Sequence, residues 1–230
     1  MTEAQLPSYT ELVYEVLQAA ERPLAFQEVF EAVERQRPIT TRVPKATIRN
    51  ALGQDRQLVN VGEGRYWYLP NCIRGSLLRM VLTEKKPANQ PIALEHEVLH
   101  ALWPTFFEAE KRRNQRPVRV QLPTGEEAAL ALSHTVEGLR WATPVSEPLR
   151  RYLVDHRAAA GDSLLLRVTD AEQGIGEAWF ESRLRHPAEA IAARNRELTD
   201  AAQQFMRERR EDRRPIWEVA IALLARGAYR

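Results

Sequence analysis

The sequence has little cysteine and no long apolar run, and both absences exclude classes of protein. Its only cysteine is Cys72, so no intramolecular disulfide can form, which favours a reducing compartment. Its most apolar stretch, IWEVAIALLA, is roughly half of the ~20 residues that a membrane-spanning helix needs. The acidic beginning, MTEAQLPSYTELVYE, lacks the basic flank and apolar centre of a secretion signal. We therefore expect an intracellular, cytoplasmic protein with no membrane segment.

Net charge is also small, at +2, but the charges are unevenly distributed. Residues 1–34 carry seven glutamates and one arginine, whereas residues 35–70 carry seven Lys or Arg and two acidic residues. Such a change of sign within one small unit predicts that one side of the unit faces an anionic partner.

The first seventy residues show three helical patterns followed by two short strands. SYTELVYEVLQAA and FQEVFEAVERQ have apolar residues at helical spacing, and Ser8 or Thr10 can cap the first helix. Pro44 suits the first turn of a third helix, whose buried face would contain Ala46 or Thr47, Ile48, Ala51 and Leu52. Two strands, 58–61 and 65–69, would then be joined through Gly62-Glu63-Gly64.

Three helices followed by a hairpin are typical of a winged helix-turn-helix domain. The third helix of such a domain can enter the major groove of DNA while the hairpin lies along the backbone. We therefore expect the acidic first two helices to point away from DNA. The DNA-binding residues predicted on the third helix, its exit and the hairpin are Lys45, Thr47, Arg49, Asn50, Arg56 and Arg65.

The stretches RPLAFQEVFEAV and TIRNALGQDRQLVNVGEGRYWYLP resemble the HARE-HTH winged helix over residues 8–70. That family occurs in the delta subunit of bacterial RNA polymerase, in chromatin proteins and beside restriction enzyme domains. The resemblance implies contact with DNA or with a polymerase, and it leaves open which of the two applies.

The middle of the chain contains many short strand patterns. LLRMVL, QPIAL, RPVRVQL, EEAALALSH, LRWATPV, GDSLLLRV and IGEAWFES alternate with turn residues. Two short helices are expected among them, one near each end. This arrangement predicts a small closed β-barrel.

The same order is similar to the DNA-binding pseudobarrel of plant transcription factors and to the N-terminal effector domain of EcoRII-type restriction enzymes, over about residues 76–181. In those families two loops grip the major groove, and by position they correspond to 83–89 and 134–140. The resemblance implies DNA contacts by Lys85, Lys86, Asn89 and Arg140, whose side chains can contact phosphates, guanine or adenine. The basic run KRRNQR at 111–116 is interpreted as an exposed loop.

The sequence HEVLH, from His96 to His100, matches the zinc-peptidase pattern H-E-x-x-H. Two histidines one helical turn apart can share a zinc ion, and Glu97 could then polarise a bound water. The match lacks the third histidine of the longer motif, and Pro104 ends the helix early. A third ligand could come from Glu126, Glu127 or Glu137. The alternative is an ordinary amphipathic helix with its histidines on the solvent side.

Two further helices are expected at the C-terminal end. PAEAIAARNRELTDAAQQFMRERRE has a narrow apolar stripe, and IWEVAIALLARG is an amphipathic helix that ends at Gly227. These helices would pack on the barrel or pair with a second copy, giving a homodimer.

The sequence thus predicts an α+β protein: a winged helix-turn-helix domain (1–70), a small β-pseudobarrel (73–183) and a helical C-terminal extension (184–230). We expect a non-catalytic double-stranded DNA-binding protein, a transcription regulator or the recognition component of a DNA-processing system. RNA polymerase and a nuclease subunit are the candidate protein partners, and no cofactor or metal is assigned. The alternatives are a zinc-dependent peptidase centred on HEVLH and a polymerase-binding or protein-binding adaptor.

Overall fold

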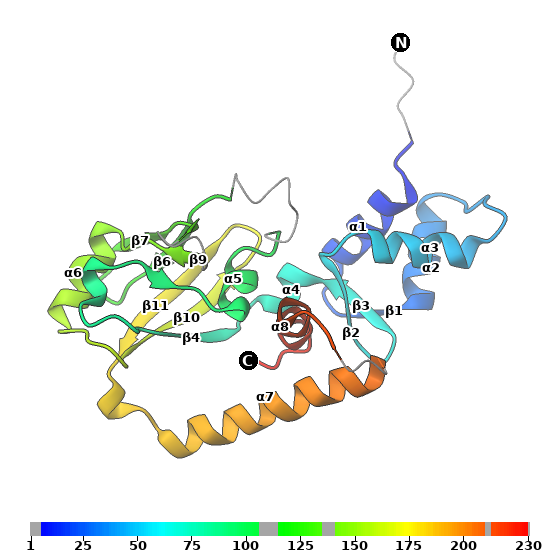
Figure 1. The fold of residues 1–230 in the computed structure, drawn as a ribbon. Helices are drawn as coiled ribbons and strands as arrows, with labels where there is room; N and C mark the ends of the chain where they lie inside the picture. Colours follow the sequence, from blue (N-terminus) through cyan, green and yellow to red (C-terminus); the bar gives the residue numbers. More distant parts are fainter. Residues whose placement is uncertain (1–5, 106–114, 135–140, 210–212, 230) are drawn as a thin grey trace, which may run out of the picture. The chain divides into compact units, whose positions relative to one another are not determined.

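The computed structural model describes residues 6–105, 115–134, 141–209 and 213–229. The chain is a mixed α+β protein that divides into two compact units, Met1–Cys72 and Ile73–Arg230. The predicted C-terminal extension belongs to the second of these units. Figure 1 labels the helices and strands of each unit.

The N-terminal unit consists of three helices of similar length and a small antiparallel sheet. Its elements are α1 (Tyr9–Ala19), β1 (Leu24–Ala25), α2 (Phe26–Gln36), α3 (Pro44–Gln54), β2 (Leu58–Gly62) and β3 (Arg65–Tyr68). The strand order is β1-β3-β2. A short helix, α4 (Leu69–Ile73), runs across the boundary between the units.

Local sequence signals account for the start of α1. The Ser8 hydroxyl accepts a hydrogen bond from the Glu11 amide at 3.2 Å, and the Glu11 carboxylate accepts one from the Ser8 amide at 2.6 Å. This reciprocal pair is a capping box, which satisfies two amides that the helix itself leaves unbonded. Thr10, the other predicted cap, instead donates to the Gln54 side chain of α3 at 2.8 Å.

The core of this unit lies between the three helices and the hairpin. The predicted inner face of α3 is confirmed at Ile48, Ala51 and Leu52, which are all buried, whereas Ala46 and Thr47 are only half-buried. The other buried members come from the first two helices, the loop between α2 and α3, and the hairpin; they are Leu12, Val13, Leu17, Val29, Val33, Ile39, Leu58 and Tyr68.

The predicted hairpin is confirmed, and its tip has the backbone conformation that the sequence indicates. Gly62, Glu63 and Gly64 all have positive φ, at 108°, 52° and 68°. Such values are favourable for glycine and suit a tight turn between twisted strands. The third strand, β1, was not expected, although Leu24 and Ala25 pair with Tyr66 and Arg65 of β3.

The Glu28 carboxylate stabilises the first turn of α2 through hydrogen bonds. These bonds predict that the stability of the protein depends on pH. The carboxylate accepts hydrogen bonds from the Arg22 guanidinium at 2.6 Å and from the Ala25 amide at 2.7 Å. The bond from Arg22 and then that from Ala25 lower the pKa of Glu28 to about 2, from a usual value of 4.5. The stabilisation is therefore present above pH 4.5 and is lost as the pH falls towards 2.

Changing Glu28 to Gln should accordingly flatten the loss of stability between those two pH values. Melting temperatures recorded across that range would measure the effect. Glu34→Gln, exposed on the same helix, is the matched control. An equal flattening in both variants would contradict the role given to Glu28.

The described strands of the second unit form two sheets. The larger has the order β4-β10-β11-β6-β7 and the smaller has the order β5-β9-β8. Neighbouring strands are antiparallel except for β11 and β6, which run parallel. The strands are β4 (Leu77–Val81), β5 (Ile92–Ala93), β6 (Val118–Gln121), β7 (Glu127–Leu130), β8 (Ser133–His134), β9 (Trp141–Thr143), β10 (Ser163–Asp170) and β11 (Ile175–Glu181).

The sequence predicted one closed barrel for this region. The strands in the described part of the chain form two sheets that no β-ladder joins there, so the closed barrel stays a prediction. The two short helices that were expected are present as α5 (His96–Leu102) and α6 (Glu147–Asp155). Two short 3-10 helices, η1 (Pro87–Asn89) and η3 (Arg183–Arg185), were not expected. The structure therefore establishes a mixed α+β unit for this part of the chain.

The two C-terminal helices are present as predicted, as α7 (Ala188–Arg209) and α8 (Ile216–Ala225). Gly227 follows α8 with a φ of 72°, which fits a glycine that ends a helix. Helix α8 packs on α5, and Phe205 of α7 is buried with the Arg226 guanidinium 5.3 Å from its ring centre. No helix within the described residues is long and apolar enough to cross a membrane.

Candidate nucleic-acid interface

The outer face of α3 carries three of the predicted DNA-binding residues of the N-terminal unit. Lys45, Arg49 and Asn50 are exposed, whereas the opposite face of the helix is buried in the core. Because residues three to four positions apart lie on the same side of a helix, Lys45 and Arg49 form one exposed basic stripe. The helix therefore presents two cations and an amide to solvent.

Arg49 is held in place by an aromatic ring. Its guanidinium carbon lies 4.9 Å from the centre of the Phe26 ring, at the start of α2. A stacked guanidinium is attracted by the face of the ring and loses some of its rotational freedom. Arg49 is therefore partly oriented before any ligand binds.

Thr47 was predicted to contact DNA, and the structure gives its hydroxyl a local role. The hydroxyl lies 2.9 Å from that of Thr41 and donates to the Val43 carbonyl at 3.3 Å. Thr47 thus ties the loop between α2 and α3 to the first turn of α3.

Two residues of that loop were missed by the sequence analysis. Arg42 and Val43 directly precede α3 and are exposed, and 57% of the Val43 surface is accessible. The stretch TTRVPK could have drawn attention to them, since a cation and an apolar residue stand just before the helix-starting Pro44. They extend the exposed surface beyond the N-terminal end of α3.

Arg56 and Arg65 are also exposed, beyond α3 and at the start of β3 respectively. Arg65 has an acidic neighbour, because its charge is one of the causes that lower the pKa of Glu28. The acidic residues of α2 are therefore not all remote from the basic ones, since Glu28 lies near Arg65; the orientation of these helices relative to DNA stays a prediction. The physical reason is the pairing of β1 with β3, which brings the start of α2 near the hairpin.

Of the two DNA-binding loops predicted in the second unit, the structure describes the first, residues 83–89. Lys85 and Lys86 are exposed immediately before η1, and Asn89 is exposed at its end. Arg140 and its loop 135–140 lie outside the described residues, as does most of the basic run 111–116.

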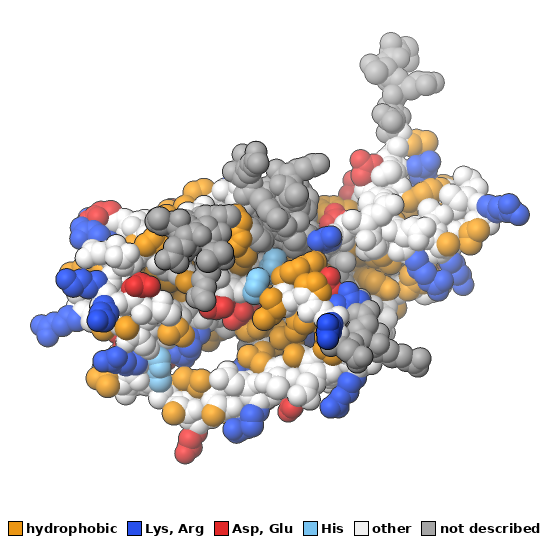
Figure 2. Space-filling view, viewed as in Figure 1, with side chains coloured by type: hydrophobic (Ala, Val, Ile, Leu, Met, Phe, Trp, Pro, Cys, Tyr) orange, Lys and Arg blue, Asp and Glu red, His pale blue; other side chains and the backbone are white. Residues whose placement is uncertain are grey.

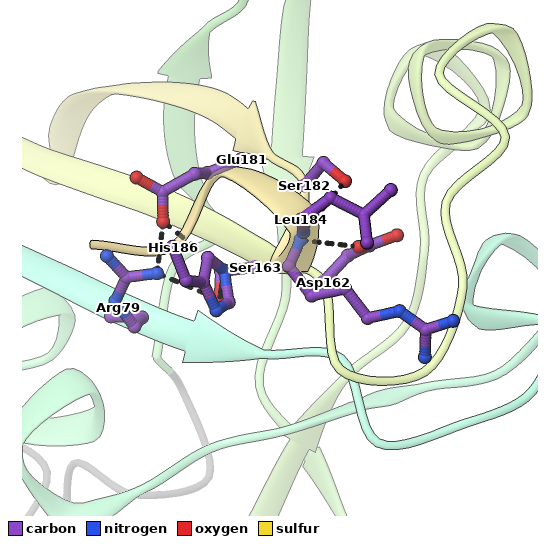
Figure 3. Close-up of polar contacts among 8 residues, drawn as sticks. Arg79, Asp162, Ser163, Glu181, Ser182, Leu184 and His186 are labelled. Carbon is purple, nitrogen blue, oxygen red and sulfur yellow. Dashed lines mark hydrogen bonds and ion pairs between the residues drawn. The ribbon is translucent and has the colours of Figure 1, made fainter. Parts of the chain in front are cut away.

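A partly buried polar cluster in the second unit combines a serine, a histidine and a carboxylate (Figure 3). The Ser163 hydroxyl lies 3.3 Å from Nε2 of His186, and a Glu181 oxygen lies 3.3 Å from the same nitrogen. Arg79 donates to Ser163 at 3.2 Å and to Glu181.

This cluster does not have the geometry of a catalytic triad. A triad places the serine and the carboxylate on different nitrogens of the histidine ring, so that one orients the ring while the other receives a proton. Here both contact Nε2, and Ser163 has no accessible surface. The cluster instead connects β4, β10 and β11 to the segment that leads into α7.

The histidines of HEVLH lie on α5, the helix on which α8 packs. His100 is 1% exposed and its ring centre is 6.3 Å from that of Trp217 in α8, so the prediction of a solvent-facing position is wrong for this residue. The pale-blue histidine side chains that Figure 2 shows lie at the surface, whereas His100 is buried. Within the described residues, no group of three or more His, Cys, Asp or Glu side chains could hold a metal ion.

We expect metal removal to have no effect on this protein, because α5 is explained by its packing on α8. Zinc in the purified chain should be well below one equivalent, and a chelator should leave the melting temperature unchanged. Elemental analysis and thermal unfolding would measure both. Stoichiometric zinc that is lost together with stability on chelation would contradict this and favour the peptidase alternative.

No protein-family model matches this chain, and no curated protein matches it either. The case for a function therefore rests on the residues described above.

Proposed function

We propose that this chain is a non-catalytic double-stranded DNA-binding protein, and that its N-terminal unit is a winged helix with α3 as the groove-binding helix. One observation carries the proposal: Lys45, Arg49 and Asn50 are exposed on the side of α3 opposite its buried residues. The order of α1, α2, α3 and the β2–β3 hairpin is compatible with this reading, as is the resemblance to the HARE-HTH family.

The charges of the unit favour a polyanion over a neutral partner. Cations that approach DNA phosphates release condensed counterions, which supplies much of the free energy of association. Lys45 and Arg49 would supply such contacts from α3, and Arg65 would supply one from the hairpin. Arg49 would lose little conformational freedom on binding, since Phe26 already orients it.

The second unit would add contacts through the exposed Lys85, Lys86 and Asn89. This part of the proposal rests on the resemblance to DNA-binding pseudobarrels, in which a loop at the corresponding position contacts bases. A cytoplasmic transcription regulator, or the recognition component of a DNA-processing system, would fit such a two-unit binder. RNA polymerase or a nuclease subunit would then be a further partner.

The proposal predicts different effects on the two sides of the N-terminal unit. Lys45→Ala and Arg49→Ala should each weaken binding to duplex DNA of any sequence, because a phosphate contact is lost. Glu15→Ala and Glu31→Ala, at exposed positions of α1 and α2, should change the affinity little. Fluorescence anisotropy with a labelled random duplex, at one fixed salt concentration, would measure all four.

The melting temperatures of the same variants control for folding, since exposed substitutions usually change stability by no more than about 0.5 kcal/mol. Equal effects of the basic and the acidic changes would contradict the proposal. In that case the charge asymmetry would serve a protein partner, as in the adaptor alternative.

A further inference from the structure

An apolar side chain stands exposed at the start of the proposed groove-binding helix. Val43 has 57% of its surface accessible, and its neighbours Arg42 and Lys45 are exposed as well. We infer that Val43 is a base-reading residue, which contacts the C5-methyl group of a thymine in the major groove. This inference rests on the proposed DNA-binding function of α3.

Valine is poorly suited to its position for folding alone. Val43 is the residue that precedes the first turn of α3, and its carbonyl accepts from the Thr47 amide at 3.1 Å. At this position Ser, Thr, Asp or Asn is preferred, because their side chains accept a hydrogen bond from the first turn, whereas valine is among the least favoured residues. Val43 makes no such bond and leaves apolar surface in water.

Hydrogen bonds and the following proline restrain the backbone of Val43, which suits a residue that contacts a base in one defined position. The Thr47 hydroxyl donates to the Val43 carbonyl at 3.3 Å and lies 2.9 Å from the Thr41 hydroxyl. Pro44 restricts the conformation of the residue before it, and a β-branched side chain has few rotamers. Val43 would therefore lose little freedom on contact.

Single exposed apolar residues are common on protein surfaces, and the surroundings of Val43 distinguish it from such cases. Arg42 precedes Val43 and Lys45 follows it two positions later, both exposed, and Arg49 lies one helical turn beyond Lys45. The exposed apolar side chain is thus close in the chain to three cations. DNA offers the matching pattern, since the thymine methyl is the apolar group on the base edges of the major groove and phosphates border that groove. The N-terminal residues of a groove-binding helix are the ones that usually reach base edges.

The test uses the full chain and a duplex enriched from a random pool by that chain. The duplex is synthesised once with thymine and once with deoxyuridine, which pairs identically but lacks the methyl group. The wild-type protein should bind the thymine form about three- to fivefold more tightly, as expected for one buried methyl group. Val43→Ser should bind both forms equally, and Val43→Ile should keep the preference.

Controls separate this inference from the proposed function. Val43→Ser should keep the wild-type salt dependence of binding and should melt no lower than the wild type. Arg49→Ala should instead lower the affinity for both duplexes by the same factor and keep the preference for thymine. Salt-dependent binding with equal affinity for the two duplexes, enriched sequences without a fixed thymine, or the same preference in Val43→Ser would each overturn the inference alone. No salt-dependent binding to either duplex would overturn the proposed function and this inference together.

Discussion

Replacing Ile48 with alanine should destabilise the N-terminal unit by about 2–5 kcal/mol, the usual cost of removing a large aliphatic side chain from a packed core. Ile48 is fully buried on the inner face of α3, in one cluster with Leu12, Leu17 and Val29. A unit of the size of Met1–Cys72 has a total stability of roughly 4–11 kcal/mol. The variant should therefore lose much of its folded N-terminal unit, and with it the exposed basic face of α3.

Urea unfolding of the full chain would measure this change, and Gly53→Ala offers a matched control on the same helix. A Cβ at Gly53 would meet no atom within 4 Å, and alanine inside a helix is favoured over glycine by about 0.5–1 kcal/mol. The two variants should thus shift the transition of the N-terminal unit in opposite directions. If Ile48→Ala instead shifts every part of the unfolding curve equally, the chain unfolds as one cooperative body and the division at Cys72 does not describe its folding.

Gly176→Ala should destabilise the second unit by about 1–3 kcal/mol, because the added methyl group has no space. A Cβ at Gly176 of β11 would lie 2.8 Å from the carbonyl oxygen of Arg167 on β10. It would also lie 3.7 Å from Cγ1 of Val120 on β6. The close neighbour is backbone, so β10 and β11 would have to move apart, and the effect should fall on the centre of the larger sheet.

The neighbouring position provides the control for this change. Glu177 is exposed and pairs with Arg167 at 3.3 Å, and a surface ion pair of this kind contributes about 0–1 kcal/mol. Glu177→Ala should therefore leave the transition of the second unit almost in place. Thermal unfolding of both variants would measure these effects. An unchanged transition in Gly176→Ala would contradict the prediction and show that β10 and β11 can move apart at little cost in stability.

Helices and the hairpin were predictable where a local signal stands beside a periodic pattern. Local signals mark the starts of two helices, at Ser8 with Glu11 and at Pro44. Gly227 marks the end of a third helix, and the turn at Gly62–Gly64 marks the hairpin. The exposed positions of Lys45 and Arg49 followed from the same helical spacing. These features depend on residues close together in the chain, so they can be predicted from a sequence pattern.

Features that depend on distant residues were not predictable in this way. The strand β1 has only two residues, too few for any periodicity, and it is identified by its pairing with β3. His100 is buried because α8, more than a hundred residues later, packs on α5. The ring of Phe26 under Arg49 and the closeness of Glu28 to Arg65 likewise arise from packing between elements.

The salt dependence of duplex binding tests the central proposal most directly. The affinity of the full chain for a random duplex, measured at several salt concentrations, should fall linearly on a log–log plot. Each phosphate contact contributes a slope of about −0.9, so Arg49→Ala should flatten the wild-type slope by roughly one unit. An affinity that does not depend on salt, or a slope that Arg49→Ala leaves unchanged, would contradict the proposal that the outer face of α3 binds DNA.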